Sequence, residues 1–158
     1  MNKALLKTPL GNAILEGDSK GISKLTLTEE ASEHLELQAP ELQEAIDQLQ
    51  QYFSGKLKEF SLKLNPQGTD FQKKVWQALL TIPYGRTTSY MDLAKELGDP
   101  LAIRAVAAAN GKNPLWIFIP CHRVIGSDGS LTGYAGGLWR KRWLLEHEQP
   151  AKQQSLFI

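Results

Sequence analysis

The chain has 158 residues, of which 42% are hydrophobic and 22% are charged. This length and composition predict one compact domain with room for a small attached subdomain, and they exclude a disordered chain. No apolar run approaches the roughly 18 residues of a membrane span, and the first residues lack the apolar segment of a secretory signal. The one cysteine, Cys121, excludes an internal disulfide and a multi-cysteine zinc site, and it indicates a reducing, cytoplasmic location.

The formal net charge of +1 conceals an uneven distribution. Residues 1–68 carry seven Lys and ten Asp or Glu, whereas residues 69–158 carry eleven Lys or Arg and seven Asp or Glu. The first part is therefore acidic and the second is basic. An anionic partner is expected to bind the second part of the chain.

The first part of the chain is expected to begin with an antiparallel meander. Residues 4–8, 12–15 and 22–26 are short segments rich in strand formers, and turn residues separate them. Apolar side chains then recur at helical spacing over residues 42–53, which predicts an amphipathic helix. Alternating apolar side chains over residues 60–64 predict a further strand before a turn that ends at Gly68.

A change of pattern at Thr69 indicates a second, mainly helical domain. Thr69 and Gln72 have the spacing of a capping box, and Phe71, Val75 and Leu79 form an apolar stripe. These residues predict an amphipathic helix that begins at the capping box. We therefore place the boundary between two domains at residue 68, with domains over residues 1–68 and 69–150 and a tail over residues 151–158.

Two short helices follow, joined by Gly98-Asp99-Pro100, as in a helix-turn-helix. The second helix, residues 101–110, contains several alanines and a single charged side chain, Arg104. On composition alone, packing of these small residues against a neighbouring helix is the commoner explanation. Close approach to DNA is the alternative explanation, and the position of Arg104 on a surface of small residues is consistent with it.

The segment that carries the cysteine lies between a predicted core strand and a flexible loop. Residues 115–119 are an apolar run typical of a buried strand, and Pro120 ends it. Residues 126–137 contain five glycines, which predict a loop able to bring backbone groups close to a ligand. The last helix is expected over residues 138–148.

Cys121 is either a buried apolar residue, the commoner role of a lone cysteine, or a nucleophile. His122 and Arg123 follow it directly and predict a cationic setting that lowers the pKa of the thiol. With Glu148 they supply a nucleophile, a base and an orienting carboxylate. This set suits a cysteine hydrolase as well as a transferase.

Several runs together resemble the O6-alkylguanine-DNA alkyltransferases. They are residues 111–114 (GKNP), 119–125 (IPCHRVI), 133–137 (GYAGG) and 143–148 (WLLEHE). The resemblance covers residues 69–158 almost without interruption and extends more weakly to the amino-terminal part. It implies an α+β protein with a small ribonuclease-H-like amino-terminal subdomain and a mainly helical, winged-helix-like DNA-binding domain.

The resemblance also implies roles for individual residues of the reactive site. Cys121 matches the alkyl acceptor, and His122 matches the base that removes the thiol proton through a water molecule. Glu148 matches the carboxylate that orients this histidine. Asn113 matches a residue that braces the site, and Tyr90 matches the tyrosine whose hydroxyl donates to the leaving guanine.

Further matches concern DNA and the extruded base. Arg104 matches the arginine that enters the base stack. The small residues around it suit the minor groove, which differs from the major-groove docking usual for a helix-turn-helix. The predicted DNA contacts are Arg104, Ala102, Ala105, Ala107, Ala108 and Ser89. The predicted pocket residues are Val124, Tyr134, Ala135 and Gly136, of which Ala135 stands where many relatives have serine.

The implied activity is direct repair of O6-alkylguanine in double-stranded DNA, with O4-alkylthymine as a further candidate substrate. The base is extruded, and the alkyl group moves irreversibly to Cys121, so that each molecule reacts once. Two alternatives remain: a protein that binds alkylated DNA without reacting, and a cysteine hydrolase. The sequence leaves open the preference among alkyl groups and the cooperativity on DNA.

Other features of the sequence allow fewer conclusions. We expect no cofactor and no metal, a monomer, and a solvated His34. The run Arg140-Lys141-Arg142 is expected either to contact phosphates or to form a solvated helix face. The tail from Gln153 to Phe157 resembles the peptide by which bacterial repair proteins bind the sliding clamp, and packing on the protein's own surface is the alternative.

Overall fold

The structure is a computed structural model that describes residues 2–30 and 40–149. Its fold class is α+β, as predicted. The chain forms two compact units, one of Met1–Gln67 with Pro114–Phe118 and the other of Gly68–Asn113 with Ile119–Ile158. The predicted boundary at residue 68 does not account for residues 114–118, which belong to the first unit.

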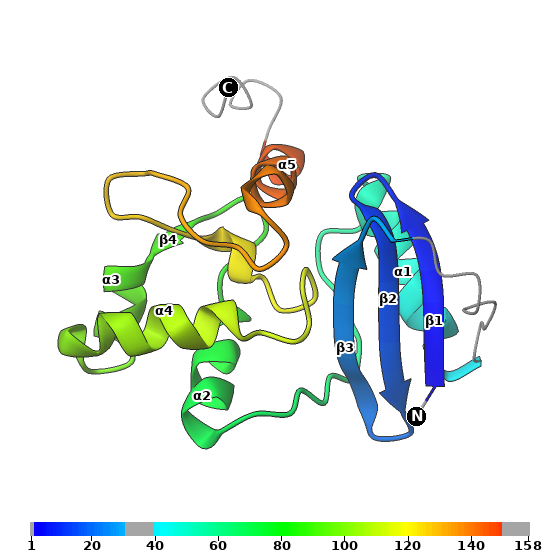
Figure 1. Cartoon of the computed structure of the whole chain (residues 1–158), viewed down its shortest axis with the longest axis horizontal. Coiled ribbons are helices and arrows are strands. Elements are labelled where there is room, and N and C mark those ends of the chain that lie inside the picture. Colours follow the sequence, from blue (N-terminus) through cyan, green and yellow to red (C-terminus); the bar gives the residue numbers. More distant parts are fainter. Residues whose placement is uncertain (1, 31–39, 150–158) are drawn as a thin grey trace. The chain divides into compact units, whose positions relative to one another are not determined.

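The first unit contains a three-stranded antiparallel sheet in the order β1-β2-β3 (Figure 1). The strands are β1 (Asn2–Thr8), β2 (Gly11–Asp18) and β3 (Gly21–Thr28). Alternate residues of β2 and β3 are buried, and Leu15 pairs with Leu25 at the centre of the sheet. This alternation is the pattern of a sheet with one face on the core. The predicted meander is confirmed.

One helix of the first unit packs against this sheet. A 3-10 turn (Pro40–Leu42) leads into α1 (Gln43–Phe53), which confirms the predicted helix. Ile46, Leu49 and Tyr52 lie on its buried face. Their spacing of three residues places them along one stripe of the helix, which explains the observed packing.

The strand predicted over residues 60–64 is wrong. Only an isolated bridge between Leu64 and Ile22 is present there. The backbone of Ser61 pairs instead with the side chain of Gln48, whose Oε1 accepts from the Ser61 amide at 2.9 Å. A side-chain amide from α1 therefore takes the hydrogen bonds that a strand neighbour would supply.

The second unit begins with α2 (Asp70–Leu79). The capping box is present: the Thr69 hydroxyl accepts from the Gln72 amide at 3.1 Å, and Gln72 Oε1 accepts from the Thr69 amide at 2.9 Å. The expected helix start is confirmed. The apolar stripe is partly wrong, because Phe71 is 40% exposed. Buried Trp76 completes the packed face instead.

A helix pair follows, as predicted. It consists of α3 (Tyr90–Glu96), a 3-10 turn (Pro100–Ala102) and α4 (Ile103–Gly111). Ser89 caps α3 by accepting from the Asp92 amide at 3.0 Å. Helix α4 packs against both α2 and α3. The exposed side of α4 is therefore the side away from these two helices.

The predicted buried strand over residues 115–119 is also wrong. A single bridge joins Leu115 to Leu25, and the chain then turns at Ile117, whose φ is +75°. A positive φ is strained for a β-branched residue. The run is largely buried, as its apolar composition predicts. Two backbone hydrogen bonds join Leu25 to Pro114 and Trp116, and the turn at Ile117 ends the pairing there.

The reactive segment follows this turn. Cys121–Arg123 form a 3-10 turn, and the next two residues form β5 (Val124–Ile125), which pairs in parallel with β4 (Thr88–Ser89). The last helix, α5 (Leu138–Glu148), has the predicted bounds and contacts the 3-10 turn. No helix within residues 2–30 and 40–149 is long and apolar enough to cross a membrane.

Candidate active site around Cys121

The sulfur of Cys121 lies in a closed environment, and the residue is 5% exposed. Burial raises the pKa of the thiol to about 11, although a hydrogen bond from Asn113 and the charge of Lys141 act in the opposite direction. The prediction of a lowered thiol pKa is therefore wrong. His122 and Arg123, which were expected to lower it, pair with the carboxylate of Glu148 instead. The resting thiol carries its proton and needs a base to become a nucleophile.

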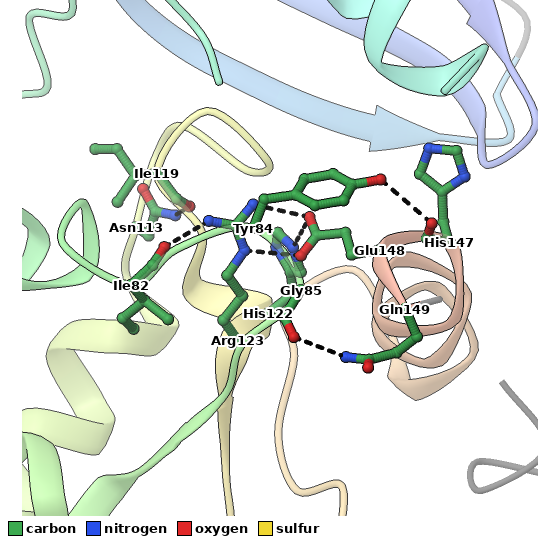
Figure 2. Close-up of polar contacts among 10 residues, drawn as sticks. All are labelled: Ile82, Tyr84, Gly85, Asn113, Ile119, His122, Arg123, His147, Glu148 and Gln149. Carbon is green, nitrogen blue, oxygen red and sulfur yellow. Dashed lines mark hydrogen bonds and ion pairs between the residues drawn. The ribbon is translucent and has the colours of Figure 1, made fainter. Parts of the chain in front are cut away.

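The carboxylate of Glu148 lies at the end of α5 (Figure 2). Glu148 Oε2 lies 2.8 Å from His122 Nε2, and both side chains are almost completely buried. Burial alone would raise the pKa of Glu148, but His122 and Arg123 outweigh it and hold the pKa well below the usual range. Glu148 is therefore an ionised acceptor at neutral pH.

Arg123 is the second partner of this carboxylate. Its Nε donates to Glu148 Oε1 at 2.8 Å and its Nη2 donates to Oε2 at 3.0 Å, while Nη1 donates to the Ile82 carbonyl at 2.7 Å. Bidentate pairing of this kind fixes the plane of the carboxylate. Three hydrogen bonds thus tie the end of α5 to two consecutive residues of the turn that carries Cys121.

This arrangement determines where His122 carries its proton. An ionised carboxylate only accepts, so the nitrogen that faces Glu148, Nε2, carries the hydrogen. In the neutral ring Nδ1 then has a lone pair. Nδ1 is buried and has no hydrogen-bond partner within residues 2–30 and 40–149. The geometry therefore provides a base with a vacant acceptor, oriented by a carboxylate.

Two asparagines hold the turn. Asn113 Nδ2 donates to the Ile119 carbonyl at 2.8 Å, and the same side chain hydrogen-bonds the thiol of Cys121. Asn110 Nδ2 donates to the Cys121 carbonyl at 3.4 Å. Asn113 was predicted here from the resemblance, whereas Asn110 was not.

Tyr90 lies at the same site. Its hydroxyl donates to the Thr132 carbonyl at 3.0 Å and also hydrogen-bonds Asn110. Burial raises the pKa of Tyr90, hydrogen bonds with the side chains of Thr132 and Asn110 lower it, and the charge of Cys121 raises it. The structure therefore brings together five predicted residues, Cys121, His122, Glu148, Asn113 and Tyr90.

Lys141 contradicts both expectations for the basic run on α5, whereas Arg142 is exposed, as expected for a solvated helix face. The side chain of Lys141 is fully buried, and Nζ donates to the carbonyls of Val124, Thr132 and Gly133 at 2.6, 2.8 and 3.1 Å. Burial lowers the pKa of Lys141 to about 8. Arg140 is also buried, with Nη1 on the Gly136 carbonyl at 2.9 Å. These two side chains therefore bind backbone carbonyls in and next to the glycine-rich loop, and they are not free to bind phosphates or to face solvent.

A cavity of about 440 Å³ opens beside Tyr90. Predicted residues Tyr90, Arg104 and Ala107 line it, together with Ile103, Thr132 and Gly133, which were not predicted. The predicted pocket residues Val124, Tyr134, Ala135 and Gly136 do not line this cavity. Tyr134 nevertheless lies near Cys121. Burial raises the pKa of the Tyr134 hydroxyl, and the charge of Cys121 raises it further.

Five of the six predicted DNA contacts lie on or next to α4, and the sixth, Ser89, lies at the start of α3. Arg104, Ala105 and Ala108 are exposed, and Ala102 and Ala107 are partly buried. Ser89 is partly buried as well, and its hydroxyl oxygen serves as the cap of α3. Packing against a neighbouring helix, the alternative explanation for the alanines, accounts only for Ala109, which is buried. Three of the six predicted contacts are therefore exposed, and the other three are partly buried.

Three residues of the site were missed: Arg123 as the clamp of Glu148, Lys141 and Asn110. The signal for Arg123 was its place in the IPCHRVI run, but nothing in the sequence connects it to Glu148. Within residues 2–30 and 40–149, no group of three or more His, Cys, Asp or Glu side chains is arranged to hold a metal ion. His34 and the predicted clamp peptide, Gln153 to Phe157, lie outside the described residues.

Two protein-family models match the chain. One is described as the DNA binding domain of 6-O-methylguanine DNA methyltransferase and matches residues 70–150. The other is described as the ribonuclease-like domain of the same protein and matches residues 1–66. Together they account for nearly the whole chain.

Individual proteins are similar over comparable lengths. A methylated-DNA--protein-cysteine methyltransferase of Methanosarcina barkeri is 49% identical over 151 residues, which cover 92% of this chain and 95% of that protein. The constitutive protein of this name from Bacillus subtilis is 50% identical over 140 residues, which cover 82% of this chain and 84% of that protein. The crystal structure of Mycobacterium tuberculosis OGT in complex with DNA is 46% identical, covers 99% of both chains and has a TM-score of 0.86.

Proposed function

Because the chain belongs to the 6-O-methylguanine DNA methyltransferase family and acts in DNA repair by alkyl transfer, we propose that Cys121 is the residue that accepts the alkyl group. The observation that carries this proposal is the connected set of Cys121, His122 and Glu148. The buried thiol of high pKa stays protonated at rest, and the adjacent base, whose proton position is fixed, is available to take its proton.

The proposed reaction begins with transfer of the thiol proton. A water molecule passes the Cys121 proton to Nδ1 of His122, and Glu148 stabilises the imidazolium that results. The thiolate sulfur then attacks the alkyl carbon in line, so that an S–C bond forms while the bond from carbon to guanine O6 breaks. The electron pair stays on the purine, where the Tyr90 hydroxyl stabilises it by donating a hydrogen bond, and the proton held by the His122 imidazolium returns through water to complete the neutral guanine. The stable thioether ends the activity of the molecule.

The alkylated base must leave the duplex to reach a buried sulfur, at a cost of a few kcal/mol. We propose that α4 lies in the minor groove, with Ala102, Ala105, Ala107 and Ala108 near the backbone. Arg104 fills the space left in the base stack. This assignment is supported by the exposure of Arg104, its position at the cavity, and the excess of basic residues after residue 68.

A single experiment tests the proposed acceptor. Incubation with a duplex that contains O6-methylguanine is expected to place one methyl group on Cys121, detected by peptide mass spectrometry, while the lesion reverts to guanine. The reaction should stop after one equivalent of lesion per protein. Tight binding with an unmodified Cys121 would favour a lesion-binding protein, and turnover well beyond one equivalent would favour a cysteine hydrolase.

A second partner is proposed for the tail. The run from Gln153 to Phe157 has the residue types of a sliding-clamp peptide, and an isolated peptide of this kind binds as a short linear segment. Deletion of residues 153–158 is expected to abolish binding to the clamp in a pull-down assay and to leave methyl transfer to a free duplex unchanged. Clamp binding that survives the deletion would contradict the proposal.

We also propose that the protein acts as a monomer in the cytoplasm. All side chains of the proposed reaction come from one chain. The reaction consumes a reduced thiol, which a reducing compartment preserves.

A further inference from the structure

A tight turn over residues 83–86 lies between α2 and β4. The Arg86 amide donates to the Pro83 carbonyl at 3.1 Å, and Gly85, the third residue of the turn, has a φ of +80°. A type II turn requires a positive φ at this position, and glycine adopts it without strain. The run Pro-Tyr-Gly therefore specifies a sharp change of direction at this point of the chain.

This turn binds the residues on both sides of Glu148 (Figure 2). The Tyr84 hydroxyl donates to the His147 carbonyl at 3.3 Å. On the other side of Glu148, Gln149 Nε2 donates to the Gly85 carbonyl at 3.3 Å. The last carbonyls of a helix have no partner within the helix, and Tyr84 supplies a donor to one of them. Two hydrogen bonds thus hold the end of α5 against the turn.

Gly85 also comes very close to the backbone of Glu148. A methyl group at Gly85 would lie 3.1 Å from the Glu148 carbonyl oxygen, so that one of the two would have to move by a few tenths of an ångström. Glu148 is the last residue of α5, and the position of its carboxylate therefore depends on how the helix end is held. The absence of a side chain at Gly85 is what permits the observed position.

The same segment contacts the other partner of this carboxylate. The Ile82 carbonyl accepts from Arg123 Nη1 at 2.7 Å, and the guanidinium carbon lies 5.8 Å from the centre of the Tyr84 ring. This distance is within reach of a cation–π interaction. Residues 82–85 therefore contact both Arg123 and the helix end that carries Glu148, which in turn holds His122 at 2.8 Å.

We propose that Gly85 is a positioning residue for the transfer reaction, because it lets the turn seat the end of α5 where Glu148 reaches His122. This inference rests on the proposed function. The carboxylate determines which nitrogen of His122 carries the hydrogen, so a displaced carboxylate orients the base less well toward the thiol of Cys121. Gly85 acts through Glu148 and not on the reacting atoms.

The test compares Gly85→Ala with Gly55→Ala, a matched control in the other unit. Both glycines have a φ of +80°, but a methyl group at Gly55 would meet no atom of the described residues within 4 Å. The two variants therefore carry the same backbone strain, and only Gly85→Ala crowds Glu148. Single-turnover methyl transfer from a duplex that contains O6-methylguanine is measured at several protein concentrations and pH values.

At saturating protein and neutral pH, Gly85→Ala is expected to react about tenfold more slowly than Gly55→Ala. The expected loss is smaller than that for removal of a general base, because the base is displaced but still present. The protein concentration that gives the half-maximal rate should be the same for both variants. The deficit should narrow in alkaline solution, where hydroxide ionises Cys121 without the base.

A second pair of variants applies if Gly85→Ala does not fold. Asparagine tolerates a positive φ better than alanine does, and its Cβ still approaches the Glu148 carbonyl. Gly85→Asn is therefore compared with Gly55→Asn, and the same slower, pH-dependent transfer is expected.

Equal saturating rates at the two glycine positions would overturn the inference, and so would a deficit of the same size at every pH. Either result would leave the transfer reaction itself intact. Failure of the wild-type protein to take a methyl group on Cys121 would instead overturn the proposed function, and the inference with it. The two failures are therefore distinguishable in the same experiment.

Discussion

Replacement of Arg123 by methionine is expected to lower the free energy of unfolding by about 3–5 kcal/mol, the usual cost of removing one partner of a buried ion pair. The side chain of Glu148 is 1% exposed and receives two hydrogen bonds from Arg123. Without the guanidinium, a buried carboxylate loses both of these hydrogen bonds and the charge that compensates it. Urea denaturation followed by tryptophan fluorescence measures the change.

A second substitution separates charge from packing. The double variant Arg123→Met with Glu148→Gln has no uncompensated carboxylate, so it should recover a substantial part of the stability lost in Arg123→Met. A loss below about 1 kcal/mol in Arg123→Met, within the range of ordinary point mutations, would contradict the clamp role of Arg123.

Replacement of His122 by glutamine is expected to slow single-turnover methyl transfer at neutral pH by about a hundredfold or more, the contribution of a positioned general base. Glutamine can still donate to Glu148, but it has no basic nitrogen at the position of Nδ1. Because the pKa of the Cys121 thiol is about 11, little thiolate forms at neutral pH without that base. The deficit should narrow as the pH rises and hydroxide ionises the thiol.

The matched control is His147→Gln, which alters a histidine whose ring stacks on Trp143 at 4.8 Å between centroids. Its side chain takes no part in the proposed proton transfer, so the rate and its pH dependence should be those of the wild-type protein. A His122→Gln variant with the wild-type rate and pH profile would show that the thiol loses its proton by another route.

Elements with local signals were predictable from the sequence. The capping box of Thr69 and Gln72 and the bounds of α5 (Leu138–Glu148) depend on residues within a few positions of one another. Residues 60–64 and 115–119 have strand-like composition, and both were predicted wrongly. Their backbone partners come from distant segments, such as Gln48 for Ser61, and composition contains no information about such partners.

The candidate site was only partly predictable, for the same reason. Cys121 and His122 stand out as neighbours, but Glu148 is 26 residues away from His122, and the resemblance to a known family made the connection. A charged residue on a helix is usually solvated, so the buried position of Lys141 could not be inferred. The thiol pKa was predicted in the wrong direction, because adjacent charges are visible in a sequence whereas burial and the pairing of those charges with Glu148 are not.

The buried Lys141 ammonium acts as a non-covalent cross-link between two segments of chain. It joins Val124 to Thr132 and Gly133, and so closes the exposed segment between them as a short loop. A neutral amine has only two hydrogens to donate. As the pH rises through about 8, the pKa of Lys141, one of the three carbonyls therefore loses its donor. The lowered pKa shows that burial disfavours the ammonium relative to water, so closure of the loop becomes more favourable as the pH rises above about 8, although one of the three hydrogen bonds is lost.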